Sequence, residues 1–180
     1  MTLSVRRSVA AIAVGAALVL AGCSGPAGPD RAAVVDGQVL SERELQTTVG
    51  QVNGLQPALE QIQGPLSATS TLNVLVQGPV YLAYLRDRGV VVSDTVARQQ
   101  AEQRGVADPA DGTLTVIKLN SALAAAQDSG EFGEADAVAI QQQILDLDVE
   151  VNPRYGTRDT TTGAIQLTTP DWVTSPDAAQ

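Results

Sequence analysis

Apolar and polar residues alternate most regularly near the end of the chain. Leu147, Val149 and Val151 are separated by acidic residues, which places the apolar and the charged side chains on opposite faces of an extended segment. Asn152-Pro153 ends the run, because proline lacks a backbone N–H and restricts the residue before it. The pattern predicts a strand. Because a lone strand would leave its N–H and C=O groups unpaired, it also predicts a partner strand elsewhere in the chain.

A second β signal lies in the segment AAVVDGQVL, residues 32–40. Its two short apolar runs flank Asp36-Gly37, a dipeptide that is typical of two-residue hairpin turns. Ser41 follows, with Glu44 three residues later, and this spacing is typical of the capping box that begins a helix. We therefore expect this hairpin to pair with the late strand and a helix to follow it directly.

The chain between these two β signals has helical patterns. The stretch 70–88 is apolar on nearly all faces and indicates a buried central helix, bent at Gly78-Pro79. Capping residues and apolar spacing predict three more helices, at 93–105, 112–128 and 134–146. Between residues 53 and 70, glycines and prolines interrupt the pattern, and only one short helix is expected, around 58–63. A short strand is expected at 164–168. The expected fold is mainly α, with a small β pairing of the N-terminal and late strands.

The beginning of the chain has the pattern of an export signal. Arg6 and Arg7 precede an apolar run that is too short to cross a membrane and fits the hydrophobic region of a secretory signal. The run ends in the sequence LAGC, in which Cys23 is the only cysteine, and this resembles the bacterial lipobox. The resemblance implies that the Cys23 thiol receives a diacylglycerol, that cleavage makes Cys23 the mature N-terminus, and that the anchor contains acyl chains such as palmitate. An ordinary cleavage site with an incidental cysteine is the alternative.

These patterns divide the chain into four expected segments. They are a lipoprotein signal peptide (1–22), a Gly/Pro-rich tether (23–31), a helical domain (32–160) and a C-terminal tail (161–180). The expected location is the extracytoplasmic face of the cell membrane, with the lipid at Cys23 as the anchor.

The mature chain is strongly acidic. It keeps all 20 acidic residues and loses only Arg6 and Arg7 of the 11 basic ones, which leaves a net charge of −11. Because binding of a phosphate backbone depends on clustered Lys and Arg, we expect no nucleic-acid partner. The charge also keeps the domain soluble beside an anionic membrane surface.

Residues with catalytic or metal-binding chemistry are scarce. The chain has no histidine, which excludes Ser-His-Asp, Cys-His and zinc-histidine sites. A calcium-loop spacing that begins at Asp146 fails, because its sixth position is Val151 instead of glycine and its twelfth is Thr157 instead of glutamate. Carboxylate pairs such as Asp108/Asp111 are typical of surface charge. We expect no enzyme activity, no cofactor and no metal.

The turn NPRYG after the late strand allows two interpretations. Arg154 and Tyr155 could contact an anionic ligand, or Tyr155 could pack on the core where the strand ends. The second interpretation is the simpler one, because an Asn-Pro turn that closes a strand needs no ligand.

The order of these parts resembles a known family. The lipobox, the segment AAVVDGQVLSEREL, several helices and the closing VEVNPRYGT are similar to the SurA N-terminal-domain family of bacterial extracytoplasmic chaperones, over about residues 32–160. The resemblance implies that the first and late strands pair antiparallel, with Val149–Asn152 against Ala33–Val39, while the helices form a cradle. Many relatives continue into a parvulin-type isomerase domain with two active-site histidines, which this sequence lacks. The resemblance therefore implies that the chain binds clients without isomerising prolyl bonds.

The function expected from this resemblance is that of a membrane-anchored, holdase-like module that binds unfolded or extended segments of exported polypeptides. The candidate client-binding residues are Leu75, Leu82 and Tyr84, on the apolar helix at 70–88. Alternatively, these three side chains fill the core. Two other functions remain open: an adaptor that docks one specific envelope partner, and a lipoprotein that delivers a small ligand to a transporter.

Overall fold

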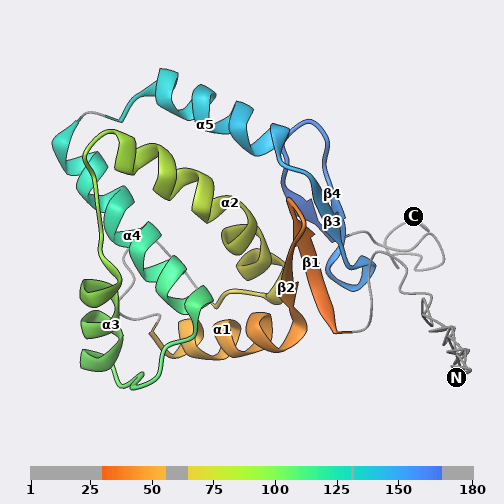
Figure 1. The fold of residues 1–180 in the computed structure, drawn as a ribbon, viewed down its shortest axis with the longest axis horizontal. Helices are drawn as coiled ribbons and strands as arrows, with labels where there is room; N and C mark the ends of the chain where they lie inside the picture. Colours follow the sequence, from red (N-terminus) through yellow and green to blue (C-terminus); the bar gives the residue numbers. More distant parts are fainter. Residues whose placement is uncertain (1–29, 56–64, 131, 168–180) are drawn as a thin grey trace, which may run out of the picture.

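The computed structural model describes residues 30–55, 65–130 and 132–167. Within these residues the fold consists of five α-helices with a small antiparallel sheet at one end (Figure 1). The helices are α1 (Glu42–Leu55), α2 (Ala68–Asp87), α3 (Asp94–Gln103), α4 (Asp111–Ser129) and α5 (Glu134–Asp146). The strands are β1 (Arg31–Val35), β2 (Gln38–Ser41), β3 (Val149–Val151), β4 (Thr157–Arg158) and β5 (Ile165–Gln166), with a 3₁₀ turn η2 (Pro153–Tyr155) after β3. The mainly helical fold class with its small sheet is confirmed.

The expected pairing of the late strand is also confirmed. The sheet has the order β2-β1-β3, and β3 runs antiparallel to β1 with Val149 opposite Val35 and Val151 opposite Ala33. Asp36 and Gly37 connect β1 to β2 with φ angles of 48° and 79°, as the predicted two-residue turn requires. The backbone N–H of Asp36 donates to the carbonyl of Asp148 at 2.8 Å, so the hairpin turn itself holds the start of β3.

Helix α2 is the centre of the helical part (Figure 1). It contacts α1, α4, α5 and β1, and its buried side chains, such as Leu72 and Leu85, lie on different sides of the helix. This explains why the sequence is apolar on nearly all faces of the segment. The helix begins after Ser67, whose Oγ accepts from the backbone N–H of Ser70 at 3.0 Å, and it continues through Pro79.

Capping residues set the boundaries of the neighbouring helices as the sequence predicts. The Oγ of Ser41 accepts from the N–H of Glu44 at 3.1 Å, and the Oγ of Ser93 accepts from the N–H of Val96 at 3.3 Å. Helix α5 has the predicted bounds. The short helix expected around 58–63 lies outside the described residues.

The folded domain extends beyond its expected limits at both ends. Arg31, which the sequence assigns to the tether, is the first residue of β1. Residues 161–167, assigned to the tail, complete the β4-β5 hairpin, and Ile165 is buried in the main core cluster. The sequence missed β4 because a strand of two residues carries no alternation.

Candidate functional site

An apolar groove lies between α2 and α4. We call it the amide groove; its cavity volume is about 370 Å³, and it is lined by Asn73, Val74, Gln77, Gly78, Tyr81, Leu119 and Leu123. The first five share one face of α2, and the two leucines are one turn apart on α4, so each helix presents one row of side chains to the groove. The leucines and Tyr81 are half-buried, and they therefore offer apolar surface to a ligand without being fully exposed to water.

Gly78 sets the distance between the two helices at the base of this groove. It is buried, and a Cβ added there would lie 3.3 Å from Cγ2 of Thr115 and 3.6 Å from Cδ2 of Leu119. The missing side chain lets α4 approach α2 closely at this point. Leu119 belongs to none of the apolar core clusters formed by the described residues, so its side chain contributes mainly to the groove.

Two amide side chains form one wall of the groove. The Oδ1 of Asn73 accepts from the backbone N–H of Ile165 at 2.7 Å, and its Nδ2 donates to the Ile165 carbonyl, also at 2.7 Å. The Nε2 of Gln77 donates to Oδ1 of Asn73 and to the carbonyl of Gly163, both at 3.4 Å. The amides therefore attach residues 163–165 to α2, and the Oε1 of Gln77 accepts no hydrogen bond from the described residues.

A second polar cluster ties the end of α2 to the start of α5. The hydroxyl of Tyr84 donates to Oδ1 of Asp136 at 2.8 Å, and the N–H of Gly133 donates to Oδ2 at 2.8 Å. The guanidinium of Arg88 lies 2.5 Å from Oδ1 of Asp136 and 4.0 Å from the centre of the Tyr84 ring. The N–H of Gly133, with the Tyr84 hydroxyl second, lowers the pKa of Asp136 below its ordinary value, while burial raises the pKa of Tyr84.

Asp136 is expected to make the stability of the domain depend on pH. Because its pKa is lower in the folded state, its contribution is fully present above its unfolded pKa of 3.8 and is lost as the pH falls through the folded value. Asp136→Asn should therefore lower the melting temperature at pH 7, and its difference from wild type should shrink below about pH 3.8. Thermal melts across this range measure the effect.

Asp87→Asn is the matched control for this experiment, because the Asp87 side chain is 74% exposed and lies 3.7 Å from Arg86. Its melting temperature should follow that of wild type at every pH. A pH-independent difference between Asp136→Asn and wild type would show that the charge of Asp136 has no role in stability.

The structure divides the three candidate client-binding residues between two environments. Leu75 and Tyr84 are 6% and 9% exposed and belong to core clusters, which agrees with the alternative that these side chains fill the core. Leu82 is half-buried; it packs against the core cluster of Leu85, Ala122 and Ala126 and also lines a separate pocket beside the connection between α2 and α3. Leu119 and Leu123 were not predicted as binding residues. Together with Val116 they have the three- and four-residue spacing of any helix face that packs on the core.

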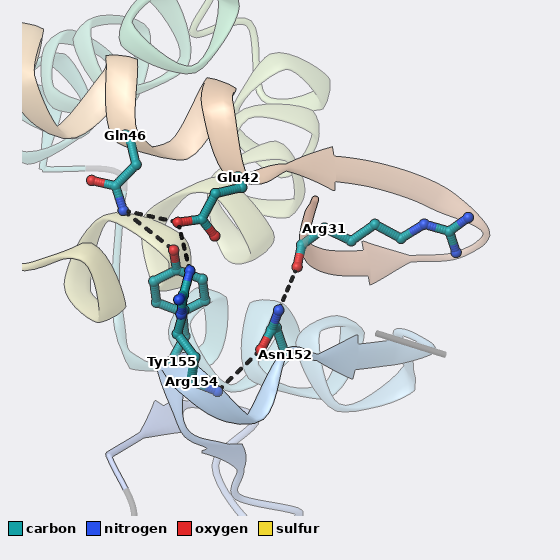
Figure 2. A network of polar contacts seen from close by, with 6 residues as sticks. All are labelled: Arg31, Glu42, Gln46, Asn152, Arg154 and Tyr155. Atoms are coloured by element: carbon teal, nitrogen blue, oxygen red, sulfur yellow. Dashed lines mark hydrogen bonds and ion pairs between the residues drawn. The ribbon is translucent and has the colours of Figure 1, made fainter. Parts of the chain in front are cut away.

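The turn after β3 has a structural role. Figure 2 shows Tyr155 below α1, where its hydroxyl receives a hydrogen bond of 3.2 Å from Nε2 of Gln46. The ring is 4% exposed, which confirms that Tyr155 packs on the core, and burial, followed by the Glu42 carboxylate, raises its pKa. Arg154 lies 3.3 Å from Oε1 of Glu42, and this ion pair attaches the turn to the start of α1.

Asn152 completes the same polar network on the other side of the turn. Its Nδ2 donates to the carbonyl of Arg31 at 2.8 Å, and its Oδ1 accepts from the backbone N–H of Arg154 at 3.1 Å (Figure 2). Residues at the two ends of the domain are joined in this way. The network attaches the turn after β3 to β1.

The described part of the chain has no cluster of three or more metal-ligating side chains and no helix that could cross a membrane. No group of three or more Cys, Asp or Glu side chains in residues 30–55, 65–130 and 132–167 is arranged to hold a metal ion. Among the same residues, no helix is both long and apolar enough to cross a membrane. Cys23 lies outside them.

Comparison with known proteins found no matching family model, no similar curated protein and no similar solved structure. The described residues form a mainly helical domain, closed by a small antiparallel sheet, with an apolar groove between the central helix α2 and α4.

Proposed function

We propose that this protein is a membrane-anchored, holdase-like module that binds unfolded or extended segments of exported polypeptides in the amide groove. The observation that supports it best is the composition of the groove, with apolar side chains from Tyr81, Leu119 and Leu123 beside the amides of Asn73 and Gln77. Binding of this kind needs no chemical step, and the proposal includes no enzyme activity, cofactor or metal.

The groove suits an extended chain for two physical reasons. Its apolar lining can bury client side chains of different shapes, because the hydrophobic effect is non-directional and depends mainly on the area removed from water. The Oε1 of Gln77 can accept from a client backbone N–H, which every residue except proline offers. Together these contacts favour extended chains over one particular sequence.

Charge supports the same function. The groove has no carboxylate, lysine or arginine among its lining residues, although the mature chain has a net charge of −11. A strongly charged surface keeps an apolar opening soluble and reduces self-association, because like charges on two copies repel each other.

The groove variant Leu119→Ser tests the proposal. It removes apolar contact area from the groove and should reduce protection against aggregation severalfold, while the free energy of unfolding falls by no more than about 2 kcal/mol. The measurement is light scattering of two unrelated proteins that aggregate on dilution from denaturant, combined with thermal melts of each variant.

Val138→Ser is the matched control, because Val138 is 64% exposed on α5 and lies outside the groove. It should protect both proteins as wild type does. Wild-type protein that fails to slow aggregation at severalfold molar excess would contradict the holdase, and capture of one stoichiometric envelope protein would then favour the adaptor.

The anchor is a separate part of the proposal. Because Cys23 is the only cysteine and a thiol is the acylation site, Cys23→Ala should abolish partition of the protein into the detergent phase. Detergent phase separation of lysates from cells that express each form measures this partition. If mutant and wild type partition equally, Cys23 is not the site of lipidation.

A further inference from the structure

A second pocket, which we call the valine pocket, lies where α2 ends. Its cavity volume is about 190 Å³, and it is lined by Pro79, Leu82, Ala83, Arg86, Val90, Val91, Val92 and Lys118. The four α2 residues follow each other at intervals of one or three positions and share one face of the helix. This face differs from the face that lines the amide groove, so the two openings can be tested separately.

Two residues at the edge of the valine pocket have no backbone hydrogen bond within the part of the chain that the structure describes. Residues 90–92 belong to the connection between α2 and α3, which Figure 1 shows as a drawn-out coil beside α4. The N–H of Val90 donates to the carbonyl of Leu85 at 3.0 Å, but the backbone groups of Val91 and Val92 make no hydrogen bond with the described residues. Val91 is also 67% exposed. An extended peptide can pair with such a segment through its own backbone.

The charged side chains that line the pocket are basic, although the chain as a whole is acidic. Arg86 and Lys118 line it, and no carboxylate does. The side chain of Arg86 is 65% exposed, with Asp87 at 3.7 Å as its ion-pair partner. Nζ of Lys118 lies 2.7 Å from Oδ1 of Asp94, which uses one of the three donors of the ammonium group. Both cations can therefore still donate to an anionic ligand.

From these three features we propose that the valine pocket binds the carboxyl-terminal end of an extended, apolar polypeptide. The last residues pair with the backbone of Val91 and Val92, the final apolar side chain enters the pocket beside Leu82, and the terminal carboxylate forms ion pairs with Arg86 and Lys118. A fatty acid offers the same carboxylate but has no backbone groups to pair with Val91 and Val92. The inference goes beyond the amide groove, which needs no free chain end.

The test uses the purified full chain and a fluorescein-labelled hexapeptide, Gly-Ser-Thr-Val-Leu-Val, as the free acid and as the C-terminal amide. Fluorescence anisotropy should show the free acid binding about tenfold more tightly than the amide, because only the acid forms charge-assisted hydrogen bonds. Arg86→Gln and Lys118→Gln should each reduce this difference severalfold. Val91→Pro, which removes the backbone N–H, should weaken both peptides.

Two further variants distinguish the valine pocket from a general charge effect and from the amide groove. Arg43→Gln removes an exposed charge on α1 outside the pocket and should leave both affinities unchanged. Leu119→Ser should leave the ratio of the two affinities unchanged, because the amide groove needs no free chain end. Equal affinity for acid and amide would overturn the inference, as would dodecanoate that competes as well as the free-acid peptide. Binding that is lost in Leu119→Ser and kept in Arg86→Gln would also overturn it, while leaving the proposed function intact.

Discussion

Tyr155→Ala is expected to lower the free energy of unfolding by about 3–5 kcal/mol, the usual range for removing a buried aromatic side chain. The ring is 4% exposed and packs in the same core cluster as Leu72, Leu75 and Ile165. Its loss would open a cavity where the late turn meets α2. In a domain of this size the melting temperature should fall on the order of 10 °C.

Tyr155→Phe separates packing from hydrogen bonding at the same position. It keeps the ring and removes only the hydroxyl that accepts from Gln46, so it should cost about 1 kcal/mol. Chemical denaturation of both variants measures the two values. If Tyr155→Ala and Tyr155→Phe were equally destabilised, the ring would not be part of the core.

Gly156→Ala is expected to destabilise the domain by about 3 kcal/mol or more. The φ angle of Gly156 is +118°, a conformation that is restricted to glycine, and an added Cβ would overlap with the backbone carbonyl of Gln166. The substitution therefore forces β5 away from β4, and with it the buried side chain of Ile165.

Gly130→Ala provides the matched control, because Gly130 also has a positive φ, of 66°, but an added Cβ would meet no atom within 4 Å. It should cost only about 1 kcal/mol, the penalty of placing a side chain in the left-handed region. Equal costs for the two alanine variants would show that the contact between Gly156 and Gln166 does not hold the β4-β5 hairpin in place.

The sequence predicted those parts of the fold that local patterns determine. Alternation at Leu147, Val149 and Val151 predicted β3, the Asp36-Gly37 turn predicted the hairpin, and Ser93 predicted the start of α3. The antiparallel pairing of β1 and β3 was expected from the resemblance to a family and from the need to satisfy backbone groups.

Features that depend on tertiary contacts were not predictable in this way. The two hydrogen bonds of Asn73 to Ile165 join residues that are 92 positions apart, and nothing near Asn73 in the sequence signals them. The segment 70–88 is apolar on nearly all faces, so its pattern could not show that Leu75 is buried whereas Leu82 lines a pocket. The amide groove depends on how α4 packs against Gly78, which no local pattern specifies.

The position of a bound client tests the proposed function most directly. A photoreactive side chain is placed at Leu119 in the amide groove or at Val138 on the exposed face of α5, and the full chain is irradiated with an unfolded client. If the groove binds extended segments, the client crosslinks from position 119 and not from position 138. Equal crosslinking from both positions, or crosslinking from 138 alone, would contradict binding in the groove.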